Sequence, residues 1–276
     1  MSIKLLYCPW PGAEKDELYE AFSKKTHIHF YTTDDLAIDF KPDIIYLQSG
    51  VIHPGNLKYI KENTGATVVQ WTGDYRPEGL PEINQYKGIA DKTFLAGGLH
   101  LYKDSIYLPH PVGKWRYRPV KDHSEGVVML ANNYGQFPGG LERQEMVRMY
   151  PEIKVYGSGW AGTSVIGRYD NCDIYQNSYL SVGCNIYNDI WGYFSDRPLE
   201  SMMSGCCFMM RHVPGLDFVH GVDCLMYKRN EEIKNLMTVD IVTRNRIARA
   251  GQKKVYDNYT QDNFVQKILD ECSRNS

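Results

Sequence analysis

The sequence predicts an α/β protein of two domains, each built on a parallel, doubly wound sheet. Three observations lead to this prediction. Short apolar stretches with the length of buried strands alternate with amphipathic stretches that have a helical period. The alternation is interrupted by a polar stretch with two prolines, residues 110–122, and it then starts again. The chain of 276 residues is long enough for two domains of ordinary size.

The first domain is expected to span residues 1–112. One helix is predicted at 14–25, which has an apolar face, and another at 54–63, where a proline can begin the first turn. The strands are short apolar runs bounded by turn residues. They are predicted at residues 3–8, 27–32, 43–48, 67–72, 92–95 and 105–108.

The second domain is expected to span residues 123–258. A last segment, 259–276, is expected to pack as a helix back across the junction between the domains. Strands of the second domain are predicted at 127–131, 153–156, 180–186, 206–210 and 225–227. Helices are predicted at 141–150, 170–175, 231–237 and 240–258, with a further one at 260–272 in the last segment.

The composition is that of a globular protein with reduced cysteines. Hydrophobic residues make up 43% and charged residues 23% of the chain. A net charge of −2 gives no bulk attraction to nucleic acid or to a membrane surface. The seven cysteines include no Cys-x-x-Cys pair, and no apolar run approaches the length of about 18 residues that a membrane span needs. We therefore expect a cytoplasmic protein without a signal peptide, a membrane span or a disulfide framework.

Motifs for metal, ATP and hydrolase sites are missing from the sequence. There is neither His-x₃-His nor His-Glu-x-x-His, and no Asp-x-Asp follows a predicted strand. The phosphate loop of kinases and the Gly-x-Ser-x-Gly elbow of hydrolases are missing as well. We therefore expect no metal site and no resident cofactor.

The stretch 195–210 combines the start of a helix with a buried strand. Ser195 or Asp196 can cap the helix, and Pro198 fits its first turn, where no N–H is needed. Small residues at the end of the helix let it lie close against a sheet, and the apolar run to Met210 follows as a strand.

Polar side chains near the start of this helix suit a nucleotide diphosphate. Arg197 and the N–H groups of the first turn favour phosphate, and Glu200 can accept hydrogen bonds from a ribose. Ser201, the next residue, is included in the predicted donor site. The alternative interpretation is that Glu200 only complements the helix dipole and pairs with Arg197.

Residues 157–162 match the pattern G-x-G-x-x-G and follow a predicted strand, so a dinucleotide site has to be considered. The residues after them show no helical pattern, and the acidic residue expected about 20 positions further on is not evident. We therefore favour a glycine-rich loop that approaches a nucleotide over an NAD site.

These motifs belong to a longer ordered series. Tyr156-Gly157-Ser158-Gly159-Trp160 precedes Arg-x-x-Glu at 197–200, and Ser-Gly-Cys-Cys-Phe at 204–208 and Gly-Leu-Asp-Phe at 215–218 follow. In this series the chain resembles the GT-B glycosyltransferases, most closely the CgeB-like group within "glycosyl transferases group 1". The resemblance covers about residues 126–270 well and the N-terminal half loosely. It implies two Rossmann-like domains facing a cleft, with the nucleotide sugar held by the C-terminal half.

The resemblance implies that the diphosphate is held by a loop with Asn133 and Tyr134 and by Arg143 on the helix that follows. An arginine suits this task because its fork binds phosphate oxygens in pairs. The alternative for Arg143 is a solvated surface arginine beside Glu142 and Glu145.

The same resemblance places further residues around the nucleotide. Tyr156 and Gly157 would approach it, and the stretch 167–170, which includes Tyr169, would lie near the edge of the base. Many GT-B enzymes carry a second glutamate eight residues before the position of Glu200. This sequence has Gly192 there, so a retaining mechanism cannot be assumed.

In the first domain, Asp74 is the candidate catalytic residue. It follows a strand that should lie centrally in the sheet, and parallel sheets place ligand-facing groups at that end. An inverting transferase needs a base near the acceptor hydroxyl, and Trp71 and Tyr75 would wall a sugar beside it. His53 and His100 are rival bases, and the alternative for Asp74 is an ordinary turn residue.

We expect a glycosyltransferase that moves a hexose or pentose from a nucleotide-diphosphate sugar to an acceptor hydroxyl without a metal ion. The acceptor is a saccharide, a small molecule, a protein or, as for some phage enzymes, a modified DNA base. Two alternatives from other classes remain open. One is a nucleotide- or sugar-binding protein without catalysis, and the other is a nucleotide-sugar epimerase of GT-B shape.

Overall fold

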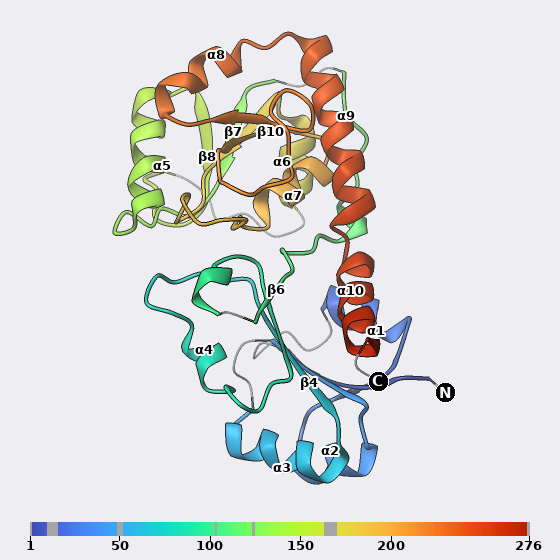
Figure 1. Ribbon diagram of the computed structural model, residues 1–276. Coiled ribbons are helices and arrows are strands. Elements are labelled where there is room, and N and C mark those ends of the chain that lie inside the picture. The colour runs from blue at the N-terminus through green and yellow to red at the C-terminus, as the bar shows by residue number, and fades with distance from the viewer. Residues whose placement is uncertain are drawn as a thin grey trace. The chain divides into compact units, whose positions relative to one another are not determined.

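The computed structural model describes residues 2–9, 16–48, 52–102, 104–122, 125–162 and 170–274 (Figure 1). Contacts within the chain divide it into two compact units. Unit 1 consists of Met1–Pro109 together with Gln261–Ser276, and unit 2 consists of His110–Thr260.

The sheet of unit 1 has the strand order β2-β1-β3-β4-β5-β6, and all of its pairings are parallel. Each strand lies within a predicted stretch. The strands are β1 (Lys4–Cys8), β2 (His27–Phe30), β3 (Ile44–Gln48), β4 (Thr67–Thr72), β5 (Lys92–Leu95) and β6 (Ile106–Tyr107).

Two α-helices and one 3₁₀ turn in the described part of unit 1 were not predicted. The helices are α1 (Glu17–Ser23), α2 (Asp34–Phe40), α3 (Pro54–Thr64), α4 (Pro81–Asn84) and the 3₁₀ turn η1 (Leu99–Leu101). Helix α2 begins where the Thr33 hydroxyl accepts a hydrogen bond from the backbone N–H of Leu36, but it buries only Ala37. Because α2 has only seven residues and α4 is a single turn, neither is long enough to produce a clear periodic signal in the sequence.

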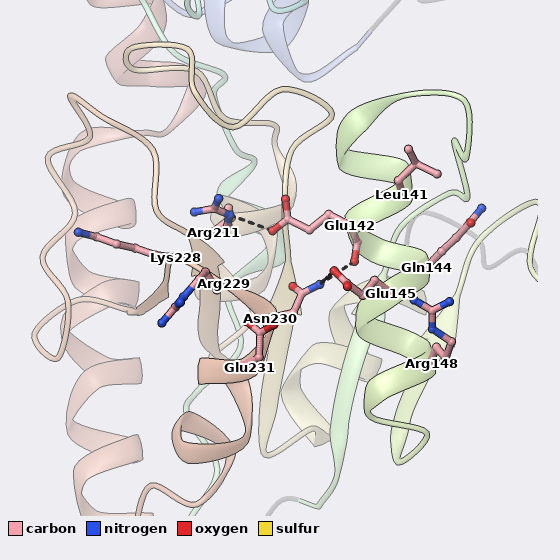
Figure 2. Close-up of a pocket in the computed structure, with 10 residues that line it drawn as sticks. All are labelled: Leu141, Glu142, Gln144, Glu145, Arg148, Arg211, Lys228, Arg229, Asn230 and Glu231. Atoms are coloured by element: carbon pink, nitrogen blue, oxygen red, sulfur yellow. Dashed lines mark hydrogen bonds and ion pairs between the residues drawn. The ribbon is translucent and has the colours of Figure 1, made fainter.

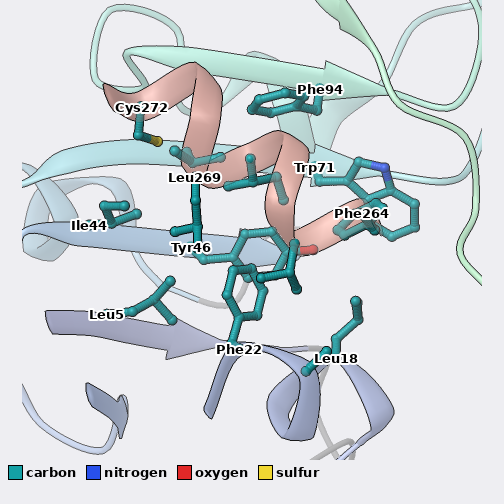
Figure 3. Packing of buried hydrophobic residues seen from close by; sticks show 14 of the residues in the cluster. Leu5, Leu18, Phe22, Ile44, Tyr46, Trp71, Phe94, Phe264, Leu269 and Cys272 are labelled. Carbon is teal, nitrogen blue, oxygen red and sulfur yellow. The ribbon is translucent and has the colours of Figure 1, made fainter. Parts of the chain in front are cut away.

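Helix α10 (Gln261–Ser273) completes the core of unit 1, although it lies at the other end of the chain (Figure 3). Phe264, Ile268 and Leu269 of α10 join Leu5 and Tyr46 from the sheet in one buried cluster. Trp71 belongs to the same cluster. This burial contradicts the prediction that Trp71 walls a sugar.

The sheet of unit 2 has the order β11-β10-β9-β7-β8, again with parallel pairings throughout. Its strands follow the predicted stretches closely. They are β7 (Val127–Leu130), β8 (Ile153–Tyr156), β9 (Leu180–Gly183), β10 (Cys207–Arg211) and β11 (Leu225–Tyr227).

The helices of unit 2 cover both faces of its sheet. They are η2 (Lys114–Arg116), α5 (Pro138–Met149), α6 (Asp170–Asn177), α7 (Arg197–Met203), η3 (Asn230–Glu232), α8 (Ile233–Met237) and α9 (Ile241–Asn258). On one face, Met146 of α5 packs with Met129 and Met209. On the other face, Tyr175 of α6 packs with Leu130, and α7 lies against β9 and β10.

The polar stretch 110–122 belongs to unit 2, whereas the sequence suggested a linker. Val112 forms a parallel bridge with Thr260, and the backbone N–H of Arg118 donates to the carbonyl of Met203. These backbone bonds explain why a stretch without periodicity is nonetheless ordered, since its polar groups are paired.

When the strands are counted from the start of each unit, the sheet of unit 2 has the order 2-1-3-4-5, and that of unit 1 has the same order with a sixth strand added. This order is typical of doubly wound folds, so the prediction of two Rossmann-like domains is confirmed. The strand order reverses between β1 and β3 in unit 1 and between β7 and β9 in unit 2. Ligands of such sheets bind at the carboxyl ends of the strands beside this switch point. Across the described ranges, every helix is too short or too polar to cross a membrane.

Candidate functional site

Unit 2 has a cavity of about 350 Å³ at the carboxyl ends of β7 and β8, between α6 and α7. This volume is within the range of small-molecule sites. The cavity therefore lies where the strand order predicts a ligand. Its lining consists of Leu130, Ala131, Asn132, Tyr156, Gly157, Asn171, Tyr175, Asp196, Arg197 and Glu200.

Glu200 forms a buried ion pair at this cavity. Its Oε1 lies 2.6 Å from Nη2 of Arg116, and the side chains are 12% and 1% exposed. The Arg116 guanidinium also stacks 4.5 Å above the ring of Trp115. Sequence reasoning missed Arg116, because it lies in the stretch interpreted as a linker. The adjacent Trp-Arg pair was the only local signal.

Arg197 stands at the start of α7 and lines the cavity with a half-buried side chain, and its contact with a diphosphate stays a prediction. Its Nη2 donates to the carbonyl of Cys184 at 3.5 Å, a long bond that holds the guanidinium loosely. Ser201 is fully buried, and its hydroxyl is hydrogen-bonded to that of Ser181 on β9. Ser201 therefore fixes α7 to the sheet, and its predicted contact with the donor is wrong.

Arg143 is also fully buried and holds the two sides of the switch point together. Its Nη1 donates to the carbonyl of Asn132 at 2.9 Å, and its Nη2 donates to the carbonyl of Cys184 at 2.7 Å. Burial, and next the charge of Arg197, lower the pKa of Arg143. In this geometry the guanidinium of Arg143 cannot reach a diphosphate in the cavity. Arg143 therefore has a structural role in place of the predicted one.

Gly157 brings the ends of β7 and β8 together. Its φ of +144° is open only to glycine, and a Cβ there would lie 2.3 Å from the carbonyl oxygen of Ala131. The close approach lets the backbone N–H of Ser158 donate to Oδ1 of Asn132 at 2.9 Å. Tyr156 and Gly157 line the cavity, and their contact with a nucleotide stays a prediction. Tyr169 lies outside the described residues.

Asn133 and Tyr134 lie beside the cavity without lining it. The Asn133 side chain donates to the carbonyl of Gly159 at 3.1 Å and accepts from Gln144 at 2.8 Å. The ring of Tyr134 is exposed and packs edge-on against Phe137. The preceding residue, Asn132, takes the place in the lining that was expected for Asn133.

Tyr175 contributes a phenol that stays protonated at ordinary pH. Burial, and next the charge of Glu200, raise the pKa of Tyr175 well above its usual value. The cavity thus combines a paired carboxylate, one loosely held guanidinium, a protonated phenol and backbone at the strand ends. This set of groups can take a ligand that carries both hydroxyls and negative charge.

Asp74 lies in unit 1, exposed, in the loop directly after β4. Its backbone N–H donates to the hydroxyl of Thr72 at 3.3 Å. His53 caps α3, where its Nδ1 accepts from the N–H of Gly55 at 3.2 Å. Asp74 is therefore at the ligand-facing end of the sheet, as the sequence predicted, and the ring of His53 already has a structural task.

Over the described part of the chain, no three His, Cys, Asp or Glu side chains gather closely enough to hold a metal ion.

Comparisons with known proteins show which fold this two-unit architecture has. Residues 141–270 match the family model described as glycosyl transferase-like. HepE (Alr3699) of Anabaena, solved with UDP-glucose, is 12% identical with a TM-score of 0.67, and the match covers 99% of this chain and 100% of that one. This chain has a GT-B fold.

Other solved GT-B structures agree over the full length. Sucrose-phosphate synthase of Thermosynechococcus elongatus is 10% identical with a TM-score of 0.67, and the match covers 99% of both chains. A glycosyltransferase of Rickettsia africae is 10% identical with a TM-score of 0.62, and the match covers both chains completely. No curated protein matches the sequence. At these sequence identities the structural similarity establishes only the fold. The chemistry of this GT-B chain has to be argued from the residues of its own site.

Proposed function

We propose that this chain is a metal-independent glycosyltransferase that uses a nucleotide-diphosphate sugar as donor. The observation that carries the proposal is the cavity of unit 2, where Glu200 is held by Arg116 beside Arg197. The glycosyl transferase-like match covers α7, which carries this glutamate. The ordered motifs further favour the CgeB-like group.

Glu200 accepts hydrogen bonds from the ribose hydroxyls in this proposal. The Arg116 guanidinium, 2.6 Å away, favours the charged carboxylate, which is the stronger acceptor. Arg197, which takes over the role expected of Arg143, contacts the diphosphate and stabilises the charge that develops as the nucleoside diphosphate leaves. The protein groups thus supply the positive charge that a metal ion supplies elsewhere.

The acceptor hydroxyl is activated by Asp74 in this scheme. The carboxylate takes the proton as the oxygen attacks the anomeric carbon, and the bond from that carbon to the diphosphate oxygen breaks. Because one displacement occurs, the anomeric configuration is inverted. The acceptor is a hydroxyl compound that unit 1 presents, and the donor sugar is a hexose or pentose.

A reducing compartment suits the cysteines. All seven are buried and free, and burial raises the pKa of Cys184 and Cys206 to about 11. Such thiols stay protonated and react slowly with oxidants. We therefore propose a cytoplasmic location, which agrees with the absence of a disulfide framework.

The test is turnover with a panel of nucleotide sugars that starts with UDP-glucose, because HepE was solved with that ligand. Each donor is incubated with and without a mixture of hydroxyl acceptors, and released nucleoside diphosphate is measured. Release that depends on an acceptor supports transfer. Conversion of the donor sugar without an acceptor identifies an epimerase, and binding without either reaction identifies a binding protein.

A further inference from the structure

Unit 2 has a second cavity, which lies on the opposite face of its sheet. Its volume is about 600 Å³, and it lies between α5, the end of β10 and the segment that follows β11 (Figure 2). Arg211 at the end of β10 is two residues after Met209 and therefore shares the face covered by α5. Leu130 and Tyr175, which line the first cavity, pack together on the other face.

The floor of the second cavity is a fixed set of planar polar groups. Nε of Arg211 donates to Oε1 of Glu142 at 2.9 Å, and Asn188 donates to Oε2 of the same carboxylate at 3.1 Å. Asn230 donates to Glu145 at 3.0 Å, as the dashed lines in Figure 2 show. These bonds hold the guanidinium, the carboxylate and the amide in place before a ligand arrives.

Asn230 leaves one acceptor unused. Its side chain is 5% exposed, its amide nitrogen is committed to α5, and nothing in the described part of the chain donates to its Oδ1. A buried carbonyl without a donor costs about 1–3 kcal/mol. This oxygen is itself buried, so a ligand hydroxyl can donate to it and recover that free energy only if the lining moves to expose it.

Charges around the second cavity nearly cancel. Three carboxylates and four cationic side chains line it. Glu142 and Arg211 neutralise each other, and Arg229 lies 3.6 Å from Glu232 outside the lining. The cavity therefore lacks the excess of cations that a phosphate or polyanion site shows. A neutral ligand with many hydroxyls fits better, because each hydroxyl both donates and accepts.

We propose that this cavity binds a neutral saccharide, as a carbohydrate site separate from the nucleotide cavity. The alternation of carboxylate, amide and guanidinium groups matches hydroxyls that point in different directions, and Leu141 offers an apolar contact for the ring carbons. The proposal does not depend on transfer activity.

The test uses the full chain and two matched substitutions on α5. Leu141 lines the cavity and is 57% exposed, so Leu141→Trp fills the space without disturbing the core. Met149 is 38% exposed on the same helix and lies outside the lining, so Met149→Trp is the control. Saturation-transfer NMR and calorimetry measure binding of glucose, maltose, maltotriose and cellobiose, with inorganic phosphate and glucuronate as anionic comparisons.

We expect at least one neutral saccharide to bind, with affinity at least tenfold lower in Leu141→Trp and unchanged in Met149→Trp. Excess UDP should leave this binding in place. The proposal is overturned if none of the four sugars binds, if only an anion binds, if UDP displaces the sugar, or if Leu141→Trp binds normally. UDP binding to the same samples reports separately on the nucleotide cavity.

Discussion

The Glu200–Arg116 pair joins a structural contact to the binding role proposed for Glu200. Arg116 is 1% exposed, and a buried charge without its partner is strongly unfavourable. Glu200 faces the cavity from the same pair. In the proposed scheme, a substitution at Glu200 changes the free energy of unfolding and the affinity for the nucleotide, so the two have to be measured separately.

We predict that Glu200→Ala lowers the free energy of unfolding by about 3–5 kcal/mol, because it strands the Arg116 charge. Affinity for UDP should fall by about 1.5–3 kcal/mol, the usual worth of a hydrogen bond to a charged group. Denaturant unfolding gives the first number, and calorimetry well below the melting temperature gives the second. Glu152→Ala, at an exposed turn, is the control. Unchanged affinity in the folded mutant would leave Glu200 with a structural role only.

Asp74 carries the catalytic prediction. Asp74→Asn keeps the size of the side chain but removes the base, so kcat should fall by about 10²–10⁴-fold while donor affinity stays constant. Asp35→Asn, also exposed in unit 1, should leave both unchanged. Near-normal transfer by Asp74→Asn would remove this residue from the mechanism and favour a retaining reaction.

At the scale of elements, the site depends on how closely two loops approach each other. The loop after β7 and the loop after β8 meet through Asn132, Asn133 and Ser158. Arg143 ties the first of these loops to the end of β9. The ends of three strands are thus fixed before any ligand binds, which lowers the entropy cost of binding.

Gly157→Ala should disrupt this arrangement. The new Cβ would lie 2.3 Å from a backbone oxygen at a φ of +144°, so the loop has to move, and strain of about 1–3 kcal/mol or more is expected. Gly162→Ala is the matched control, since its φ is +73° but nothing lies within 4 Å of a Cβ. Gly162→Ala should lower the free energy of unfolding by only about 1–2 kcal/mol, the cost of a left-handed backbone conformation for a residue other than glycine. Equal losses of stability and of UDP affinity in the two variants would contradict this account.

At the scale of the whole molecule, the two ends of the chain fold together in unit 1. Helix α10 follows α9 of unit 2 directly, yet it belongs to the core around β1, β3 and β4 (Figure 3). The stability of unit 1 therefore depends on residues more than a hundred positions away from the rest of that unit.

Truncation after Thr260 should unfold unit 1 and spare unit 2. It removes Phe264, Val265, Ile268 and Leu269, each of which contributes about 1.5–3 kcal/mol by burial. That sum is comparable to the total stability of a domain, about 5–15 kcal/mol. Hydrogen exchange should show loss of protection in β1–β5 and persistence in β7–β10. Truncation after Ser273 is the control, and protected strands in the shorter chain would refute the prediction.

The proposed metal independence is tested on the complete protein. If protein groups alone stabilise the leaving diphosphate, excess EDTA should change turnover by less than about twofold, or roughly 0.4 kcal/mol in the barrier. Steady-state rates with and without EDTA measure this. Activity that is lost and then restored by Mg²⁺ or Mn²⁺ would show that a metal ion supplies the charge.

The sequence alone determined the secondary structure of the sheets and their parallel arrangement. Buried parallel strands need continuous apolar runs, and this requirement is local, so strands such as β4 and β8 could be located to the residue. The family resemblance implied that Glu200, Gly157 and Arg197 lie at one nucleotide site, and the structure places all three in the lining of one cavity. Helix α2 was not predicted because it buries only one residue, which is too few to give a helical period of apolar residues in the sequence.

Tertiary structure decided which polar residues are available to a ligand. Arg143 and Arg197 were both predicted to contact the donor, but one is enclosed by the carbonyls of two strand ends and the other reaches the cavity. Arg116 forms its ion pair at the cavity with Glu200, which is 84 positions away in the chain. The burial and the partner of a charged side chain depend on elements that meet only in the folded protein, because the free energy of a charge is set by its whole surroundings rather than by its neighbours in the chain.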